Sequence, residues 1–386
     1  MIKNASYQYY EFFAGGGMAR AGLGDRWDCL FANDFDPSKA RSYRANWPGD
    51  DLFVGDVRHI TTDQLPGAAH LAWASFPCQD LSLAGNGAGL NGDRSGTFWP
   101  FWKLMTDLNR EGRAPAIIVL ENVCGAISSH GGRDFASICD ALNRQGYRFG
   151  AAVVDAVHFL PQSRPRLFII AARADLDIPA RLTGDSPHPV WHTKALRGAV
   201  EALKPGLRKR WIWWDFPEPA PRETRLADLI EPNPHDVAWH TPDQTAKLLG
   251  MMSDLNRQKL EQAKAEGRRI VGTLYKRTRP DGPGRKVQRA EVRFDGIAGC
   301  LRTPAGGSSR QLIMVVEGAS VRTRLLSGRE AARLMGLPDT YTLPANYNEA
   351  YHLTGDGVAV PAVRHLAEHL IEPLLKSNKS SSKHAA

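Results

Sequence analysis

A cysteine in the segment Ser75-Phe-Pro-Cys-Gln-Asp-Leu-Ser82 has the setting of a nucleophile. Cys78 follows a proline at the end of an apolar run, and open α/β sheets form their active sites at such strand ends. A thiolate there could add to an electrophilic carbon and split one difficult reaction into two easier steps. A single cysteine is more often an inert packing residue, so the interpretation depends on its partners.

Two later segments supply candidate partners. Glu121 ends the apolar part of Ile117-Ile-Val-Leu-Glu-Asn-Val123, where its carboxyl group could exchange protons with a substrate. Arg164 and Arg166 alternate along Pro161-Gln-Ser-Arg-Pro-Arg166, so an extended chain directs both side chains to one side. Guanidinium groups can stabilise negative charge that develops during a reaction. The competing interpretation is a structural ion pair between Glu121 and these arginines.

A glycine-rich turn, Phe13-Ala-Gly-Gly-Gly17, follows the first apolar run and could bring the main chain close to a cofactor. A dinucleotide is disfavoured because Arg20 stands where G-x-G-x-x-G has its third glycine. Asp34 and Asp56 follow the next two runs and could accept hydrogen bonds from a ribose and from an adenine amine. Each acid taken singly could instead cap a helix or a turn. Together with the turn, they favour an adenosine-type ligand.

The first half of the chain predicts the elements that position these residues. Residues 7–175 alternate between apolar runs and helix-like segments, which is typical of a mostly parallel sheet covered by helices on both faces. The expected strands are Tyr9–Phe13, Trp27–Ala32, His70–Ser75, Ala116–Leu120, Ala151–Val157 and Leu167–Ala172. The expected helices are a stretch that ends at Asn46, Phe98–Asn109 and Asp134–Gln145.

Beyond about residue 176 the periodicity weakens, and we interpret residues 185–318 as a second, smaller, loop-rich domain. Tryptophans within Trp211–Trp214 could stack on nucleic acid bases, although such residues more often pack a small core. A helix is expected over Arg329–Gly336. The last helix carries Val363, Leu366, Leu370 and Leu374 on one face, which predicts that it packs against a core.

Composition and charge narrow the class of protein. The chain has 386 residues, 42% hydrophobic and 23% charged, which suits a large globular domain plus a smaller one. Its net charge of +8 is concentrated between Arg257 and Arg310, where fourteen Lys/Arg residues stand against five Asp/Glu. Contact with a polyanion would explain this excess, and a solvated basic face is the alternative.

Several classes are disfavoured. Five scattered cysteines without a Cys-x-x-Cys pair indicate neither a disulfide framework nor a zinc site. No apolar run approaches the roughly 20 residues that a membrane helix needs, and the N-terminus lacks the apolar core of a secretory signal. We therefore expect a cytoplasmic protein without a membrane partner or a metal.

Eight segments, in order, resemble the motifs of the DNA (cytosine-5) methyltransferase family. They are Phe13-Ala-Gly-Gly-Gly17, Asn33-Asp34, Gly55-Asp56-Val57, Phe76-Pro-Cys-Gln79, Glu121-Asn-Val123, Gln162-x-Arg164-x-Arg166, Arg324-x-Leu326-Ser327-x-Arg329-Glu330 and Gly355-Asp-Gly-Val-Ala-Val-Pro361. The resemblance covers nearly the whole chain, and eight ordered matches make it specific. It departs from the family pattern at Asp356, where the tenth motif usually has Asn, and at Glu11, where the first usually has Asp.

The resemblance implies a Rossmann-like, S-adenosylmethionine-dependent methyltransferase fold of the bacterial kind, and methyl transfer to C5 of a cytosine flipped out of duplex DNA. Cys78 would add to C6 of the base, and Glu121 would hold N3 and the exocyclic amine. Arg164 and Arg166 would hold the base and stabilise its charge, and no metal is required. The glycine-rich segment 81–97 would close over the base, with a surface linker as the alternative.

The family pattern also implies the binding residues. S-adenosylmethionine, which leaves as S-adenosylhomocysteine, would contact Phe13, Ala14, Gly15, Gly16, Gly17, Asp34, Phe35, Asp56, Val57, Pro77, Phe98, Asp356 and Val358. DNA would contact Gln79, Ser82 and, through either phosphates or guanine bases, Arg277, Arg279, Arg285, Arg289 and Arg293. A carboxylate at position 356 could weaken cofactor binding or alter cofactor preference, and the favoured alternative is a tolerated local change.

The expected domains are residues 1–184 for catalysis and cofactor binding, 185–318 for target recognition, 319–345 for the ninth-motif helix and its connection, 346–375 for a segment that returns to the catalytic domain, and 376–386 for a disordered tail. We expect a monomer that binds double-stranded DNA and is nucleoid-associated when bound. A cognate restriction endonuclease is a further candidate partner.

Three rival functions are weighed against this interpretation. An RNA cytosine-5 methyltransferase of the same fold is disfavoured by the long basic insert. A catalytically silent DNA-binding regulator is disfavoured because the whole set of Cys78, Glu121, Arg164 and Arg166 is present. An amino-methyltransferase would carry a Pro-Pro-aromatic motif, and the chain has no Pro-Pro pair.

Overall fold

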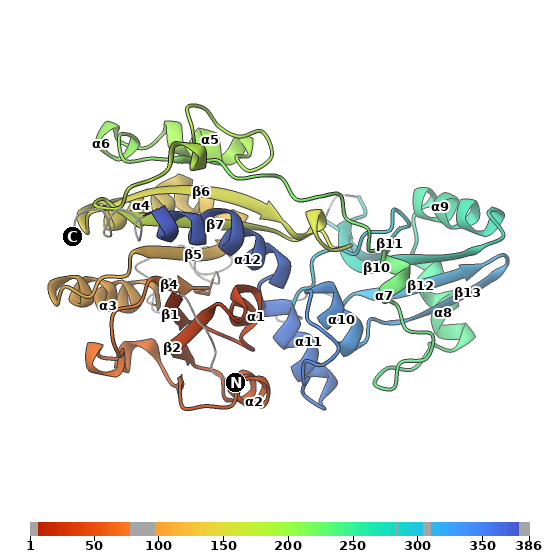
Figure 1. The fold of residues 1–386 in the computed structure, drawn as a ribbon. Coiled ribbons are helices and arrows are strands. Elements are labelled where there is room, and N and C mark those ends of the chain that lie inside the picture. The colour runs from red at the N-terminus through yellow and green to blue at the C-terminus, as the bar shows by residue number, and fades with distance from the viewer. Residues whose placement is uncertain (1–6, 78–96, 283, 304–309, 378–386) are drawn as a thin grey trace. The chain divides into compact units, whose positions relative to one another are not determined.

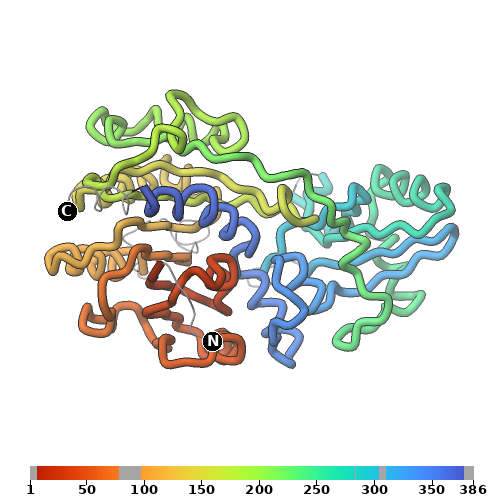
Figure 2. Tube along the Cα trace, in the orientation of Figure 1, coloured from red at the N-terminus to blue at the C-terminus, as the bar shows by residue number. Residues whose placement is uncertain are grey.

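The computed structural model describes residues 7–77, 97–282, 284–303 and 310–377. Cys78, Gln79, Ser82, residues 81–96 of the glycine-rich segment and most of the expected tail lie outside the described residues. Contacts divide the chain into two units, with residues 1–155, 165–220 and 358–386 in unit 1 and residues 156–164 and 221–357 in unit 2. The course of the chain through these segments can be followed in Figure 2.

Unit 1 is built on a seven-stranded sheet with the order β3-β2-β1-β4-β5-β7-β6 (Figure 1). The strands are β1 Tyr7–Phe12, β2 Trp27–Asp34, β3 Leu52–Val54, β4 Leu71–Ala74, β5 Ile117–Val123, β6 Tyr147–Asp155 and β7 Pro165–Arg173. Neighbours from β3 to β5 pair in parallel, whereas β7 is antiparallel to both β5 and β6. The expected mostly parallel α/β sheet is confirmed.

Helices cover this sheet on both faces. They are α1 Met18–Leu23, α2 Pro37–Asn46, α3 Phe98–Arg110, α4 Arg133–Arg144, α5 Lys194–Glu201, α6 Pro205–Arg208 and α12 Val360–Leu366. The apolar faces of α3 and α4 form one core with alternate strand residues such as Tyr10, Phe12 and Ile118. Strand side chains that alternate with these point to the opposite face, because successive residues of a strand point to opposite sides of a sheet.

The C-terminal helix packs against unit 1, as its pattern predicts. Val363, Leu366, Leu370 and Leu374 are each fully buried. α12 contacts α1 so closely that a Cβ at Gly22 would lie 2.4 Å from the Cβ of Val363. A π-helical turn, Ala367–Ile371, continues the helix. Among the described residues, no helix is long and apolar enough to cross a membrane.

Residues 185–220 belong to unit 1 by their contacts, so the structural boundary at 220–221 differs from the expected one at 184–185. The physical reason is tryptophan packing. Trp214 is fully buried and donates a hydrogen bond from Nε1 to the Ile170 oxygen at 3.1 Å. Trp211 packs against Phe149, with ring centroids 6.0 Å apart. A short ladder joins β8 Thr183–Gly184 to β9 Trp213–Trp214. These tryptophans thus serve a core.

Unit 2 contains more regular structure than its weak periodicity suggested. An antiparallel sheet has the order β11-β10-β12-β13. Its strands are β10 Arg269–Pro280, β11 Lys286–Arg293, β12 Leu312–Glu317 and β13 Ser320–Leu325. The helices are α7 Leu226–Leu229, α8 Pro242–Gly250, α9 Asp254–Ala265, α10 Gly328–Leu334 and α11 Tyr347–Asp356. Leu248, Leu260, Leu274, Val292 and Met314 contribute to a separate core in this unit.

The ninth-motif residues organise unit 2. Arg324 and Glu330 are fully buried, and Arg324 Nη2 lies 2.6 Å from Glu330 Oε1. Ser327 caps α10, because its Oγ accepts a hydrogen bond from Glu330 N at 3.1 Å and Glu330 Oε2 accepts one from Ser327 N at 2.8 Å. This capping box explains why Ser and Glu are spaced three residues apart in the motif.

Candidate active site

The candidate residues of unit 1 follow strand ends at one edge of the sheet. Strands β1 to β5 are parallel, so their carboxyl ends share this edge. The chain order reverses between β1 and β4, since β2 and β3 lie on one side and β5 on the other. In open α/β sheets such a switch point forms the crevice in which ligands bind.

The glycine turn after β1 has the strained main chain that its sequence predicts. Phe13, Gly15 and Gly17 have positive φ values of 57°, 58° and 74°. A Cβ at Gly17 would lie 2.5 Å from the Trp47 ring, whereas one at Gly15 would meet nothing within 4 Å. Glycine is therefore needed at 17 for packing, and the turn at Gly15 leaves room for a ligand to approach the main chain.

Asp34 is joined to this turn. Its Oδ2 accepts a hydrogen bond from Gly15 N at 2.7 Å, and its Oδ1 accepts one from Asp36 N at 2.8 Å. Burial raises the pKa of Asp34. The neighbouring Phe35 is 73% exposed, which is unusual for a large apolar side chain and leaves a ring face available beside the turn.

The other acids have local partners as well. Asp36 caps α2 by accepting a hydrogen bond from Ser38 N at 2.7 Å. Asp56 accepts hydrogen bonds from Arg58 N at 2.9 Å and from Arg58 Nη2 at 2.6 Å, and the hydrogen bonds from the Arg58 side chain lower the pKa of Asp56. The capping roles considered as alternatives are thus present, and they fix these carboxylates at the edge of the sheet.

Asn33 joins the ends of three strands, although the sequence indicated it only as part of a motif. It is 1% exposed, and its Nδ2 donates to the Phe53 and Gly55 oxygens at 3.2 and 2.8 Å. Its own main-chain oxygen accepts a hydrogen bond from Ala14 N at 2.8 Å. One residue therefore ties the ends of β1, β2 and β3 together.

The chain leaves β4 towards Cys78 beside the end of β5. Asn122 Nδ2 donates to the Phe76 oxygen at 3.2 Å. Phe76 is buried against Phe98, with ring centroids 5.4 Å apart, and Phe98 is fully buried at the start of α3. Pro77 is the last described residue before Cys78 and is exposed.

Glu121 and Arg166 form an ion pair at the ends of β5 and β7. Arg166 Nε lies 3.3 Å from Glu121 Oε1, and the two side chains are 13% and 10% exposed. The antiparallel register that pairs Val123 with Arg166 brings them together. The pair places a carboxylate acceptor and a guanidinium donor side by side at these strand ends.

Arg164 lies in unit 2, in the connection between β6 and β7. It is 1% exposed, and its guanidinium donates to the oxygens of Leu301, Gly355 and Gly357 at 3.0, 2.7 and 2.6 Å. Gln162 is fully buried in the same connection and donates from Nε2 to the Leu334 oxygen at 2.6 Å. These two side chains therefore join the connection to three segments of unit 2 that are distant in sequence, at residues 301, 334 and 355–357.

The tenth-motif positions divide between the units. Asp356 ends α11 in unit 2, where it accepts a hydrogen bond from Thr303 Oγ1. Val358 is buried and belongs to unit 1. Val57, in the third motif segment, is also buried. An Asn at position 356 could accept the same hydrogen bond through Oδ1, so Asp356 does not require its charge for this contact.

A buried polar cluster near the glycine turn was not anticipated as a group. Glu11 is 1% exposed, and burial raises its pKa to about 8. Its Oε2 has no hydrogen-bond partner among the described residues. Nearby, Arg20 donates to Tyr43 Oη at 2.7 Å and pairs with Asp51 at 2.5 Å. The signal in the sequence was an acid inside the apolar run Tyr9–Phe13.

The candidate DNA-contacting arginines gather on the β10–β11 hairpin. Arg277 pairs directly with Arg289 across the ladder, and Arg279 and Arg293 lie on the same face. Acidic side chains accompany them. Glu291 lies 3.5 Å from Arg277 and 2.5 Å from Arg279, Asp281 lies 3.2 Å from Arg289, and Asp295 lies 2.5 Å from Arg293. This face is therefore less positive than its arginine content suggests.

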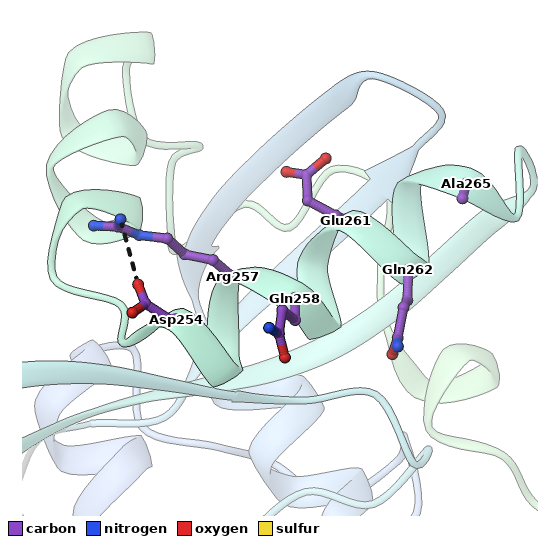
Figure 3. Close-up of a pocket in the computed structure, with 6 residues that line it drawn as sticks. All are labelled: Asp254, Arg257, Gln258, Glu261, Gln262 and Ala265. Atoms are coloured by element: carbon purple, nitrogen blue, oxygen red, sulfur yellow. Dashed lines mark ion pairs between the residues drawn. The ribbon is translucent and has the colours of Figure 1, made fainter.

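Two other features do not support a site. Among the described residues, no group of three or more His, Cys, Asp or Glu side chains could hold a metal ion. Figure 3 shows a shallow hollow along α9, lined by Asp254, Arg257, Gln258, Glu261, Gln262 and Ala265. All six residues come from one helix, and Arg257 is paired with Asp254 at 3.8 Å. Such a surface does not bring groups together from several elements, as binding sites do.

A family model described as C-5 cytosine-specific DNA methylase matches residues 7–372. The chain belongs to this family. It is therefore an enzyme of the DNA cytosine-5 methyltransferase class, and the family assignment made from eight motifs is confirmed. The matched range includes residues of both units.

Individual relatives agree with this assignment. The chain is 24% identical to "Type II methyltransferase M1.ScrFI" of Lactococcus lactis subsp. cremoris, over 98% of this chain and 81% of the relative. It is 27% identical to "DNA-cytosine methyltransferase" of Escherichia coli strain K12, over 96% of this chain and 78% of the relative. The solved Entamoeba histolytica methyltransferase EhMeth has the same fold, with a TM-score of 0.63, 14% identity and coverage of 95% and 98%.

Proposed function

We propose that this methyltransferase transfers a methyl group from S-adenosylmethionine to C5 of a cytosine in a specific duplex DNA sequence, through a covalent bond between Cys78 and C6. The observation that carries the proposal is the Glu121–Arg166 pair at the ends of β5 and β7. It lies beside β4, from which the chain continues through Pro77 into Cys78.

The cofactor edge fits an adenosine-containing methyl donor. The main chain at Gly15 is open to a ligand, Asp34 holds the turn, and the exposed Phe35 ring can pack against an aromatic group. We propose that Phe13, Ala14, Gly15, Gly16, Gly17, Asp34, Phe35, Asp56, Val57, Pro77, Phe98, Asp356 and Val358 form or support this site. When bound, S-adenosylmethionine supplies an electrophilic methyl group.

The proposed roles follow from the chemistry of cytosine, whose C5 is a poor nucleophile. The Cys78 thiolate adds to C6, and the electron pair of the C5–C6 double bond becomes available at C5 for the methyl group. The proton on C5 then passes to water, the C6–sulfur bond breaks, and the double bond is restored. Glu121 shares a proton with N3 and accepts a hydrogen bond from the exocyclic amine, which offsets the charge that develops on the ring, and Arg166 stabilises the carbonyl side.

Arg164 is better suited to positioning than to contact with the base. Its guanidinium is buried and donates to three main-chain oxygens of unit 2. We propose that it fixes the segment from Gln162 to Arg166 and so sets the place from which Arg166 reaches the base. Residues that are held in this way by their surroundings place a catalytic group within a fraction of an ångström.

A base stacked in a duplex hides C6, so we propose that the target leaves the helix and that residues 81–97 close over it. Gln79, Ser82, Arg277, Arg279, Arg285, Arg289 and Arg293 are proposed DNA contacts. The "Type II" names of several relatives support a cognate restriction endonuclease as partner. We further propose that the enzyme acts as a monomer on DNA in the nucleoid.

Trapping on 5-fluorocytosine DNA tests the covalent step, because fluorine at C5 cannot leave as a proton does. The full chain with S-adenosylmethionine should form a stable adduct with duplex DNA, whereas Cys78→Ala should bind DNA without one. Tritium transfer should favour duplex DNA over tRNA. An adduct formed by Cys78→Ala, or transfer only to tRNA, would refute the nucleophile or the substrate respectively.

A further inference from the structure

The β10–β11 hairpin has two faces of different electrostatic character. Opposite residues of an antiparallel ladder share a face, and successive residues alternate. The arginine face therefore carries Arg277 and Arg289. The other face carries Lys276 and Gln288, next to Leu274 and Ala290, which are buried in the core of unit 2.

That second face borders a hollow of about 570 Å³ in unit 2. Its walls come from α8, β10, β11 and the ends of β12 and β13, and apolar side chains such as Leu248 and Leu312 contribute to them. The polar side chains that line it are His240, Gln244, Lys247, Lys276, Gln288 and Arg310. None of the described residues that line it is acidic, in contrast to the arginine face, where three carboxylates lie among four arginines.

The groups in the hollow are arranged as hydrogen-bond donors. Gln244 Oε1 accepts a hydrogen bond from Thr241 N at 2.9 Å in the capping box of α8. The amide oxygen is therefore used by the helix cap, and the Nε2 amino group is the part of the side chain that can donate to a ligand. Arg310 is placed by a hydrogen bond to Asn348, and its guanidinium lies 5.6 Å from the Tyr347 ring centroid. Its Nε has no hydrogen-bond partner among the described residues. Lys247 and Lys276 add two ammonium groups.

The positive charge of Lys276 also acts on His240, another residue that lines the hollow. Burial, followed by the charge of Lys276, lowers the pKa of His240. His240 Nδ1 lies 2.9 Å from Thr323 Oγ1, which fixes the ring at the edge of the sheet. Three cationic side chains and an oriented amide therefore converge from different elements on one hollow without a lining carboxylate. An anion with several acceptor oxygens satisfies such a site, and a phosphodiester group has this chemistry.

We propose that this hollow binds a backbone phosphate of duplex DNA, and that it contributes more to the salt dependence of DNA binding than the arginine face does. The proposal rests on the proposed function in naming DNA as the polyanion. The arginines contribute less because their charges are already balanced in part by Glu291, Asp281 and Asp295. Neutralising a phosphate releases counterions only to the extent that the protein charge is not already compensated.

Two charge-matched double variants of the full chain test the proposal. Lys247→Gln/Lys276→Gln alters the hollow, and Arg277→Gln/Arg289→Gln alters the arginine face. Positions 276 and 277 are adjacent on β10 and point to opposite faces, so this comparison separates the faces at constant net charge. The binding constant for a fluorescent duplex is measured from about 50 to 200 mM salt, a range over which phosphate contacts strongly affect affinity.

We expect the slope of log K against log salt to fall by about 0.9 for each phosphate that the protein no longer neutralises, so by about 0.9 for the hollow variant, which loses one phosphate contact. The arginine variant should show less than half of that decrease, and both should melt at the wild-type temperature. A hollow variant with the wild-type slope, or an arginine variant whose slope falls as far, would overturn the proposal. Methylation is measured separately, so a wild-type chain that transfers no methyl group to duplex DNA refutes the proposed function and leaves the binding comparison intact.

Discussion

Replacing Arg164 with lysine separates a positioning role from contact with the base. Lysine keeps the positive charge but presents it on a single nitrogen atom. Arg164 uses two: Nη1 donates to the Leu301 oxygen, and Nη2 donates to the oxygens of Gly355 and Gly357. A lysine ammonium group cannot reproduce this planar arrangement, so at least one buried main-chain oxygen is left without its donor.

The size of the effect follows from these hydrogen bonds. A hydrogen bond to a charged group contributes about 1.5–3 kcal/mol, and a buried acceptor left without a donor adds to the destabilisation. Because Arg164 is 1% exposed, water cannot readily replace the missing donor. We expect Arg164→Lys to destabilise unit 2 by about 2–3 kcal/mol, which lowers the melting temperature by roughly 4–12 °C at about 2–4 °C per kcal/mol for a domain of this size class.

Arg166→Lys is the matched control, two residues away, where the side chain pairs with Glu121. It should melt within about 2 °C of the wild type while its kcat falls at least about tenfold, because the planar guanidinium fork is removed from beside the base. Arg164→Lys should show the reverse pattern. Its melting temperature should fall, while its kcat, measured at low temperature where the variant is folded, should fall less than that of Arg166→Lys. Calorimetry and tritium transfer measure the two quantities. A normal melting temperature with a collapsed kcat in Arg164→Lys would refute the positioning role.

Three further predictions follow from single residues. Glu121→Gln should reduce kcat by about 10²–10⁴-fold while DNA binding persists, since proton sharing with the base is removed; near-normal single-turnover rates would contradict this. Burial raises the pKa of Glu11 to about 8, so its stabilising contribution is complete below its unfolded pKa of 4.5 and is lost as pH rises to about 8. Glu11→Gln should remove that decline, and parallel melting curves for both proteins from pH 5 to 8.5 would argue against it. Asp356→Asn should keep the hydrogen bond from Thr303 and give equal or higher activity with S-adenosylmethionine; a large decrease would show that the carboxylate has a specific role.

The strands of unit 1 could be predicted because they are apolar on both faces and are bounded by turn residues. The ends of the strands were harder to predict: β6 begins at Tyr147, whereas its apolar run predicts a start at Ala151. Unit 2 was harder to predict. Near the turn between β10 and β11, charged and polar residues lie on both faces, so no simple alternation of apolar residues marks the hairpin.

The sequence by itself determined the family and the order of the reactive residues, because short motifs keep their residue types and spacing along the chain. Tertiary structure decided which side chains meet. The antiparallel register of β5 and β7 joins Glu121 to Arg166, while Arg164, only two residues away, is buried among main-chain oxygens of unit 2. Linear spacing cannot distinguish these two arginines, since their surroundings come from segments more than a hundred residues apart. The same reason applies to the hollow beside Lys276, whose donors converge from separate helices and strands.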